Sequence, residues 1–134
     1  MNKILVLALC CIFLGFSSPE NLRTQNRTNL IKLTPGMTKA QVLHIMQQNE
    51  AEDFDEDGTY AINNPYKSET LKGKRKTFEV VYYHTEVIER DRILERDELT
   101  PVIFFENKLL GWGWMYLREI VRDNEIIYKF IDEV

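Results

Sequence analysis

A run of acidic residues near the middle of the chain has the residue types and spacing that come closest to a chemical site. Residues 53–58 read D-F-D-E-D-G, which reproduces the D-x-D-x-D-G start of a calcium-binding loop. Carboxylate oxygens at alternate positions suit a hard cation, and the glycine allows the sharp bend that such a loop needs. The candidate metal ligands are Asp53, Asp55, Asp57, Thr59 and Asn64.

The end of this run departs from the calcium pattern. Asn64 stands at the position where a calcium loop carries a glutamate that binds through both carboxylate oxygens. Pro65 follows and prevents a helix from continuing there at once. Two interpretations therefore stand. The run is either an acidic loop in solvent or the weak calcium site of an extracytoplasmic module.

The other reactive residue types suggest no enzyme. His44 has no second metal ligand at a suitable spacing, and His84 lies at the polar end of an expected strand, so we interpret both as structural. No Ser-His-Asp, Cys-His or metal-spaced cluster is visible. The net charge of −4 argues against a nucleic-acid partner. We therefore expect a non-enzymatic protein with no cofactor other than the calcium considered above.

The N-terminus has the features of an export signal. Lys3 supplies a positive charge, residues 4–16 form an apolar run, and Ser17 ends a small-x-small triplet. The run is shorter than the ~20 residues that span a membrane. We expect cleavage after Ser17, and the alternatives are lipid attachment at Cys10 or Cys11 and an uncleaved anchor. Because these are the chain's two cysteines, the folded domain should contain no disulfide.

Length and composition fit a single globular domain. The chain has 134 residues, of which 44% are hydrophobic and 28% charged, as in ordinary folded proteins. Residues 18–30 are polar and show no long apolar period, so we expect a flexible tether there. The predicted organisation is a signal peptide over residues 1–17, a tether over 18–30 and one domain over 31–134.

A helix is predicted to begin after Thr38. Thr38 and Gln41 form a capping box, in which the hydroxyl accepts a hydrogen bond from a free backbone N–H and the amide reaches back. Val42, Ile45 and Met46 then follow at the spacing of one buried helical stripe. The whole acidic segment, residues 50–58, should end this helix and begin a loop.

The second half of the domain has the alternation of β-strands. Residues 66–71 and 77–88 are expected strands, joined by a basic turn. Residues 102–106 and 109–114 should form a hairpin whose turn is Asn107-Lys108. For residues 116–134 we expect a helix at the start, and a hairpin remains the alternative.

This central hairpin is apolar on both faces. The expected turn directs Gly111 and Gly113 to the same face as Phe104, where close packing of the helix or of the Phe104 ring would explain two glycines in a strand. The opposite face is the candidate partner-binding surface, unless its tryptophans belong to the core. It would consist of Ile103, Phe105, Leu110, Trp112 and Trp114.

Two sets of motifs resemble known bacterial envelope proteins. Residues 31–42 (IKLTPGMTKAQV) are similar to the helix entry of SmpA/OmlA proteins, the BamE-type outer-membrane lipoproteins. A second set, in order, resembles small exported proteins of unknown function that have the same fold. It comprises residues 64–69 (NPYKSE), 81–85 (VYYHT), 97–101 (DELTP) and 111–114 (GWGW).

The resemblance implies an α+β fold, with one or two N-terminal helices packed on an antiparallel sheet of three to four strands, in two layers. It also implies an exported protein of the periplasm or outer membrane that binds an envelope protein partner or assists assembly. Membrane contact would come through a lipid anchor. A periplasmic inhibitor-like binding protein and the calcium-dependent module are the alternative functions.

Overall fold

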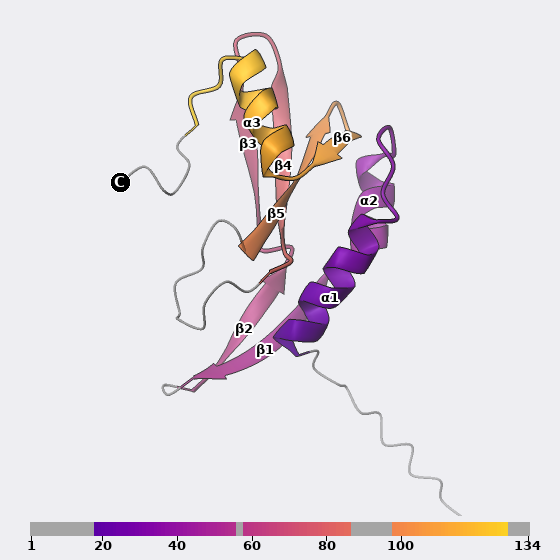
Figure 1. Cartoon of the computed structure of the whole chain (residues 1–134), viewed down its shortest axis with the longest axis vertical. Helices are drawn as coiled ribbons and strands as arrows, with labels where there is room; N and C mark the ends of the chain where they lie inside the picture. Colours follow the sequence, from indigo (N-terminus) through magenta and orange to yellow (C-terminus); the bar gives the residue numbers. More distant parts are fainter. Residues whose placement is uncertain (1–17, 56–57, 87–97, 129–134) are drawn as a thin grey trace, which may run out of the picture.

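The computed structural model describes residues 18–55, 58–86 and 98–128, and these ranges contain three helices and six strands (Figure 1). In chain order the elements are α1 (Pro19–Leu30), α2 (Lys39–Met46), β1 (Asn49–Asp55), β2 (Gly58–Asn64), β3 (Lys67–Lys72), β4 (Thr77–His84), β5 (Leu99–Phe105), β6 (Lys108–Trp112) and α3 (Trp114–Asp123). The fold is α+β with helices packed on an antiparallel sheet, which confirms the predicted class.

The first helix occupies the segment for which the sequence suggested a tether. The Ser18 hydroxyl accepts a hydrogen bond from the backbone N–H of Asn21 at 3.2 Å, and Pro19 takes the first helical position. Serine as the cap and proline just inside the helix are favourable starting residues. The prediction of a flexible tether is therefore wrong for residues 19–30.

The second helix begins as predicted. The Thr38 hydroxyl accepts from the backbone N–H of Gln41 at 3.2 Å, and the Gln41 side chain accepts from the backbone N–H of Thr38 at 2.9 Å. This reciprocal capping box satisfies two backbone donors that a helix end leaves unpaired. Val42 and Met46 are the fully buried residues of the helix.

The main sheet is an antiparallel meander in the order β3-β4-β5-β6. Tyr82 of β4 pairs with Lys67 of β3 on one side and with Pro101 of β5 on the other. The strands predicted over residues 66–71 and 77–88 are confirmed in place, although β4 already ends at His84.

The turn between β5 and β6 lies one residue earlier than predicted. Glu106 and Asn107 have φ angles of 49° and 61°, and Phe105 pairs directly with Lys108. Positive φ at both central residues is the mark of a type I′ hairpin turn. Lys108 is therefore the first residue of β6, and the predicted Asn107-Lys108 turn is wrong.

A register irregularity between Ile103 and Phe104 then changes the predicted pairing. Gly111 pairs with Ile103 and Trp112 pairs with Val102. A hairpin with the predicted Asn107-Lys108 turn would pair Phe104 with Gly111 and Ile103 with Trp112, and both of these pairs are therefore wrong. Because alternate strand residues face opposite sides, the shift moves both Gly111 and Trp112 to faces other than those expected.

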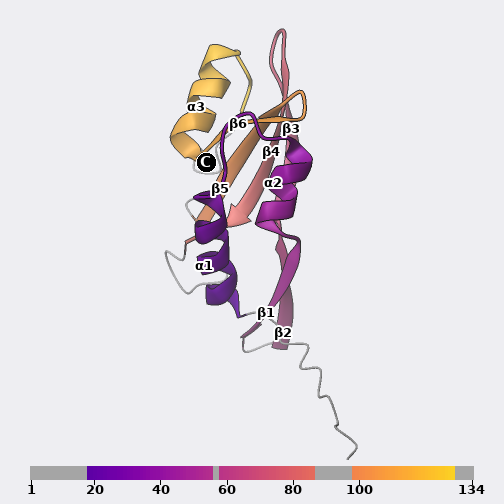
Figure 2. The same cartoon turned by 90° about the vertical axis from the view of Figure 1, so that its right-hand side faces the viewer.

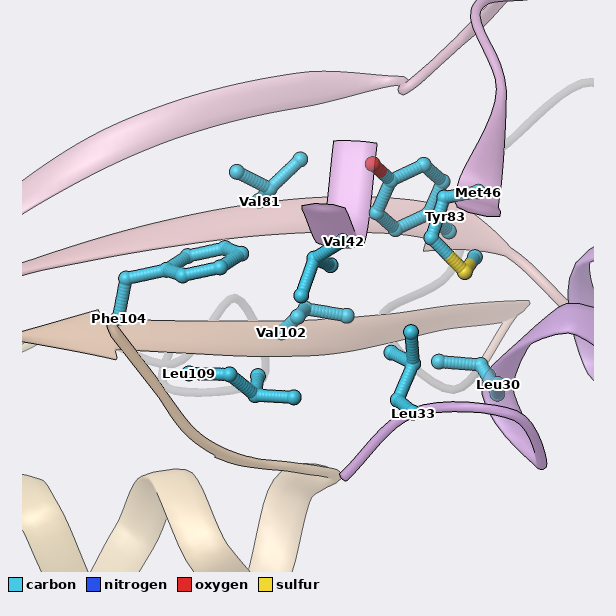
Figure 3. Close-up of a cluster of buried hydrophobic side chains, with 9 residues drawn as sticks. All are labelled: Leu30, Leu33, Val42, Met46, Val81, Tyr83, Val102, Phe104 and Leu109. Carbon is cyan, nitrogen blue, oxygen red and sulfur yellow. The ribbon is translucent and has the colours of Figure 1, made fainter. Parts of the chain in front are cut away.

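Helices cover both faces of the main sheet (Figure 2). The end of α1 and the whole of α2 cover one face, and α3 covers the other. The first core cluster, drawn in Figure 3, consists of Leu30, Leu33, Val42, Met46, Val81, Tyr83, Val102, Phe104 and Leu109. The second consists of Leu71, Phe78, Val80, Tyr82, Leu99, Ile103, Leu117 and Ile126.

Strands β1 and β2 form a separate two-stranded hairpin, which we call the arm (residues 49–64). Asp55 pairs with Gly58 near its tip, and Asn49 pairs with Asn64 at its base. Figures 1 and 2 show the arm projecting from one end of the main sheet, beside the N-terminal half of α1. The predicted loop after α2 is therefore wrong for residues 50–55, which lie in β1.

The outer edge of β6 is covered by the segment between the first two helices. Gly36 and Lys39 donate backbone hydrogen bonds to the carbonyls of Leu109 and Asn107, and Leu109 N–H donates to the Met37 carbonyl, each at 2.8 Å. In the described part of the chain, the sheet edges without a strand neighbour are therefore the outer edges of β2 and β3, together with the α1 side of β1.

The C-terminal helix confirms the first of the two predicted alternatives for this region. Gly113, with a φ of 97°, lies at its N-cap, and Trp114 begins α3 and does not extend the strand. Positive φ at this corner suits glycine, which has no β-carbon to clash.

Candidate functional site

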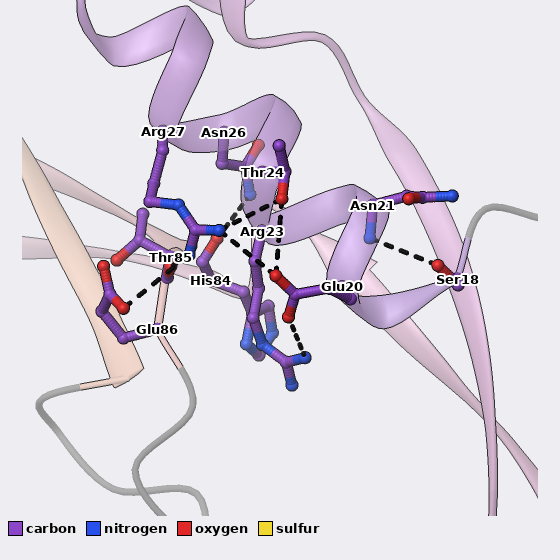
Figure 4. A network of polar contacts seen from close by, with 10 residues as sticks. All are labelled: Ser18, Glu20, Asn21, Arg23, Thr24, Asn26, Arg27, His84, Thr85 and Glu86. Atoms are coloured by element: carbon purple, nitrogen blue, oxygen red, sulfur yellow. Dashed lines mark hydrogen bonds and ion pairs between the residues drawn. The ribbon is translucent and has the colours of Figure 1, made fainter.

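Side-chain amides meet where the arm joins the rest of the protein. Asn26 of α1 donates to Asn64 of β2 at 2.9 Å, and the Asn64 amide donates back at 3.2 Å. Asn26 also donates to the backbone carbonyl of His84 at 2.8 Å (Figure 4). Both asparagines are buried, so loss of one partner would cost ~1–3 kcal/mol. The group that we call the amide cluster comprises Gln25, Asn26, Gln47, Asn49 and Asn64.

The amide cluster also holds the first strand of the arm. Gln25 donates to Gln47 at 2.9 Å, and Asn49 donates to Gln25 at 3.1 Å. Asn49 and Asn64 are paired across the base of the arm. Two successive residues of α1, Gln25 and Asn26, therefore each hold one strand of this base.

Gln47 has a strained backbone at the joint between α2 and the arm. Its φ and ψ angles are 60° and 158°, in a region that residues with a β-carbon rarely adopt. Such a conformation costs ~1–3 kcal/mol and persists only where the surroundings impose it. The hydrogen bonds from Gln25 and Asn49 to the Gln47 side chain are part of those surroundings.

His84 lies at the end of β4, beside the amide cluster. Its ring packs edge-on against Tyr66 with centroids 5.2 Å apart, and its Nε2 has no hydrogen-bond partner among the described residues. Burial, followed by the positive charge of Arg23, lowers the pKa of His84 from 6.5 to about 4. The unfolded chain therefore binds this proton at a higher pH than the folded protein, so stability falls as the pH drops from about 6.5 to about 4.

Arg27 fastens α1 to the chain that follows β4. Its guanidinium donates to the Thr85 carbonyl and lies 3.7 Å from Glu86 and 3.3 Å from Glu20 (Figure 4). The two carboxylates are largely exposed, so each ion pair contributes only ~0–1 kcal/mol. The hydrogen bond to the carbonyl mainly fixes the orientation of the helix.

This arrangement suits positioning and not bond-making. Amide side chains are uncharged and supply neither a nucleophile nor an acid–base group at neutral pH. Within residues 18–55, 58–86 and 98–128, no group of three or more His, Cys, Asp or Glu side chains could hold a metal ion. The amide cluster fixes the position of the arm relative to the sheet.

The structure does not bring the candidate calcium ligands together in a loop. Asp53 and Asp55 are in β1, Thr59 is in β2, and Asp57 lies outside the described residues. Asn64 is at the opposite end of β2 from the turn, and its side-chain amide is bonded to Asn26. The extended hairpin thus separates Asn64 from the acidic tip, which corrects the expected loop geometry.

The five residues of the candidate partner-binding face do not share a face. Ile103 is fully buried beneath α3, with Phe105, Leu110 and Trp114 packed around it in the second core cluster. Trp114 also donates to the Leu99 carbonyl at 2.8 Å. Trp112, by contrast, packs against the first core cluster on the other face. The expected aromatic surface is therefore corrected to one set beneath α3, in which Ile103 is buried and the other three residues are partly buried, and one residue on the opposite side.

Gly111 is closely packed, but against a different neighbour from those expected. A β-carbon placed on Gly111 would lie 3.0 Å from the Tyr116 ring of α3. The expected neighbours were α2 and the ring of Phe104. Gly113 faces open space, and its glycine is explained by the positive φ at the start of α3.

The predicted signal and lipidation sites, Ser17 with Cys10 and Cys11, lie outside the described residues. None of the helices in the described part of the chain has the length and hydrophobicity needed to cross a bilayer.

The sequence interpretation missed the amide cluster because asparagine and glutamine carry no motif. One local signal was available for the helix that positions it. Ser18, Pro19 and Glu20 give a capping residue, a proline at the first helical position and an acidic first turn. Nothing local links Asn26 to Asn64, which are 38 positions apart.

Comparisons with known proteins give one match. No curated protein and no solved structure matches the chain. The model of DUF3192, described as a protein of unknown function, matches residues 17–119. This range includes α1, the arm, the main sheet and the start of α3. Since the match covers well over half of the sequence, the chain belongs to the DUF3192 family.

Proposed function

We propose that the protein is a non-enzymatic, exported accessory module of the bacterial envelope that binds a protein partner through the arm. The export-like N-terminus and the resemblance to BamE-type envelope proteins support the proposed location in the cell envelope. The main support for partner binding is the outer edge of β2, which has no strand neighbour in the described part of the chain.

The composition of β2 suits pairing with another strand. Its sequence, GTYAINN, contains no charged residue and includes the strand formers Thr59, Tyr60 and Ile62. Unpaired backbone groups on such an edge form a template for an added strand. The open edge of β3 is different, because Lys67 and Lys72 at its ends hinder strand addition.

The other surfaces of the fold are less available for docking. Helices cover both faces of the main sheet, and residues 36–39 cover the β6 edge. The partner is therefore expected to contribute an extended segment that continues the two-stranded sheet of the arm. Such strand addition derives affinity from main-chain hydrogen bonds and selectivity from alternate side chains.

A proline in β2 tests this proposal. Alternate residues of an antiparallel strand direct their N–H groups outward, and counting from the turn Ala61 is expected to be one of them. Ala61→Pro removes an outward donor, whereas Ala61→Thr at the same exposed position keeps it. The folding of both variants should first be checked by circular dichroism. Each variant should then be purified from intact cells together with any bound partner.

We expect Ala61→Pro to lose the partner that wild type and Ala61→Thr retain. Recovery of barrel-assembly subunits would support an assembly accessory, and recovery of a soluble periplasmic protein would support an inhibitor-like role. Equal recovery of the same partner by Ala61→Pro would show that the partner does not pair with the β2 edge.

A further inference from the structure

The contacts of the amide cluster tie the arm to α1 in a specific place. They reach both strands at their paired base, through Gln25 to Asn49 and through Asn26 to Asn64. A contact at the tip of the arm would leave the base free to pivot. Contacts at both strands of the base set the direction in which the whole hairpin leaves the sheet.

Packing in this region is separate from the two core clusters. Leu22 of α1 and Ala51 of β1 are both fully buried, but neither belongs to the core cluster on either face of the sheet. The helix α1 contacts β1 directly and also reaches α2 and the end of β4, but among the described residues Leu30 is its one member of a core cluster. Segments that share few apolar contacts with the core tend to open as units of their own.

The joint between α2 and the arm stores strain. Gln47 is held in a backbone conformation that the unconstrained residue would leave. Its side chain is bonded to Gln25 of α1 and to Asn49 of the arm. Release of α1 would remove one of these bonds and allow Gln47 to relax, which would favour a different direction of the arm.

We propose that α1 is a clamp and that α1 and the arm open and close as one cooperative unit, separately from the main sheet. Closing of the clamp fixes the arm, and opening frees it. For partner binding this inference rests on the proposed function. A partner that pairs with the closed arm stabilises the docked position of α1, and release of α1 lowers the affinity for the partner.

Hydrogen exchange of backbone amides tests the clamp in the free protein. Asn26→Leu removes the central amide and leaves Asn64 and the His84 carbonyl without that donor. We expect exchange to rise by about tenfold to a hundredfold in both α1 and the arm, the range set by an unsatisfied buried amide. Amides of β4 and β5 should keep their wild-type rates. Asn21→Leu is the matched control, because Asn21 is exposed on the same helix.

Two results would overturn the clamp. One is faster exchange in α1 with an unchanged arm, and the other is an equal rise in α1, the arm, β4 and β5. Gln25→Ala provides a milder second variant, which loses only the hydrogen bonds to Gln47 and Asn49 and should raise exchange in the same two segments by a smaller factor. Because this experiment needs no partner, its failure is distinct from failure of the Ala61→Pro co-purification.

Discussion

Gly111 provides a sensitive test of how α3 packs on the sheet. A β-carbon at this position would lie 3.0 Å from Cε1, 3.1 Å from Cδ1 and 3.2 Å from Cζ of Tyr116. Carbon atoms in favourable contact are ~3.5–4.0 Å apart. The Tyr116 ring would therefore have to retreat by roughly half an ångström to accept even a methyl group.

Two opposing terms determine the expected size of the effect. Overpacking of this kind costs ~1–3 kcal/mol. Replacement of glycine reduces the freedom of the unfolded chain and returns ~0.4–1 kcal/mol. We therefore expect Gly111→Ala to lower the free energy of unfolding by about 1 kcal/mol, and the branched Gly111→Val to lower it by about 3 kcal/mol.

Urea unfolding of a double-mutant cycle separates these terms. In a Tyr116→Ala background the ring is absent, so Gly111→Ala should be neutral or stabilising by up to ~0.5–1 kcal/mol. The coupling between the two positions should be about 1–2 kcal/mol. Equal destabilisation by Gly111→Ala in both backgrounds would refute the reasoning, because the cost would then not come from the Tyr116 ring.

Three further predictions concern the turn, the buried histidine and calcium. Glu106→Asn should raise the free energy of unfolding by about 0.5–1 kcal/mol, because asparagine tolerates positive φ better, and an unchanged urea midpoint would contradict the type I′ turn. His84→Gln should flatten the fall in stability between pH 6.5 and about 4, which amounts to at most about 3 kcal/mol in the wild type; parallel curves for the two proteins would rule out His84 as the cause. Calorimetry should detect no tight calcium binding, and a dissociation constant of ~10⁻⁶ M or lower would instead make the acidic tip of the arm a metal site.

The elements that the sequence predicted well have strong local signals. Thr38 and Gln41 define the start of α2 through hydrogen bonds between residues three positions apart. Strands β4 and β5 were visible as runs of β-branched and aromatic residues, and these runs are apolar on both sides because both faces of the sheet are covered. These signals depend only on neighbouring residues, so they can be recognised without knowledge of the fold.

The first helix was missed because it buries polar residues. Four of its residues are buried, and two of these are Asn26 and Asn29. An apolar period is the main sign of a helix in sequence, and asparagine at inward positions erases it. The partners of Asn26 come from β2 and β4, which no local pattern can identify.

The prediction of which side chains share a face of the central hairpin was wrong for a geometric reason. Moving the two-residue turn by one position shifts each pair by two residues and leaves the faces unchanged, so Leu109 still packs with Phe104 and Leu110 with Phe105. The irregularity between Ile103 and Phe104 then shifts the pairing by one residue, and this step moves Gly111 and Trp112 to the faces opposite those predicted. Glu106 at positive φ gave no warning, because glutamate is not a residue expected there. The candidate binding face depended on this register, so the prediction put Trp112 on the wrong side of the sheet.

The course of α1 along the arm determines how the protein should be attached in binding experiments. Residue 18 caps the end of α1 that runs beside the arm (Figure 1). The Tyr128 hydroxyl, by contrast, is hydrogen-bonded to Tyr82 of the main sheet. An affinity tag, fluorophore or surface linkage attached directly before α1 would stand next to β1 of the arm, close to the proposed docking strand. A linkage placed after Tyr128 begins on the main sheet and not on the arm, so a loss of binding there reports on the protein itself.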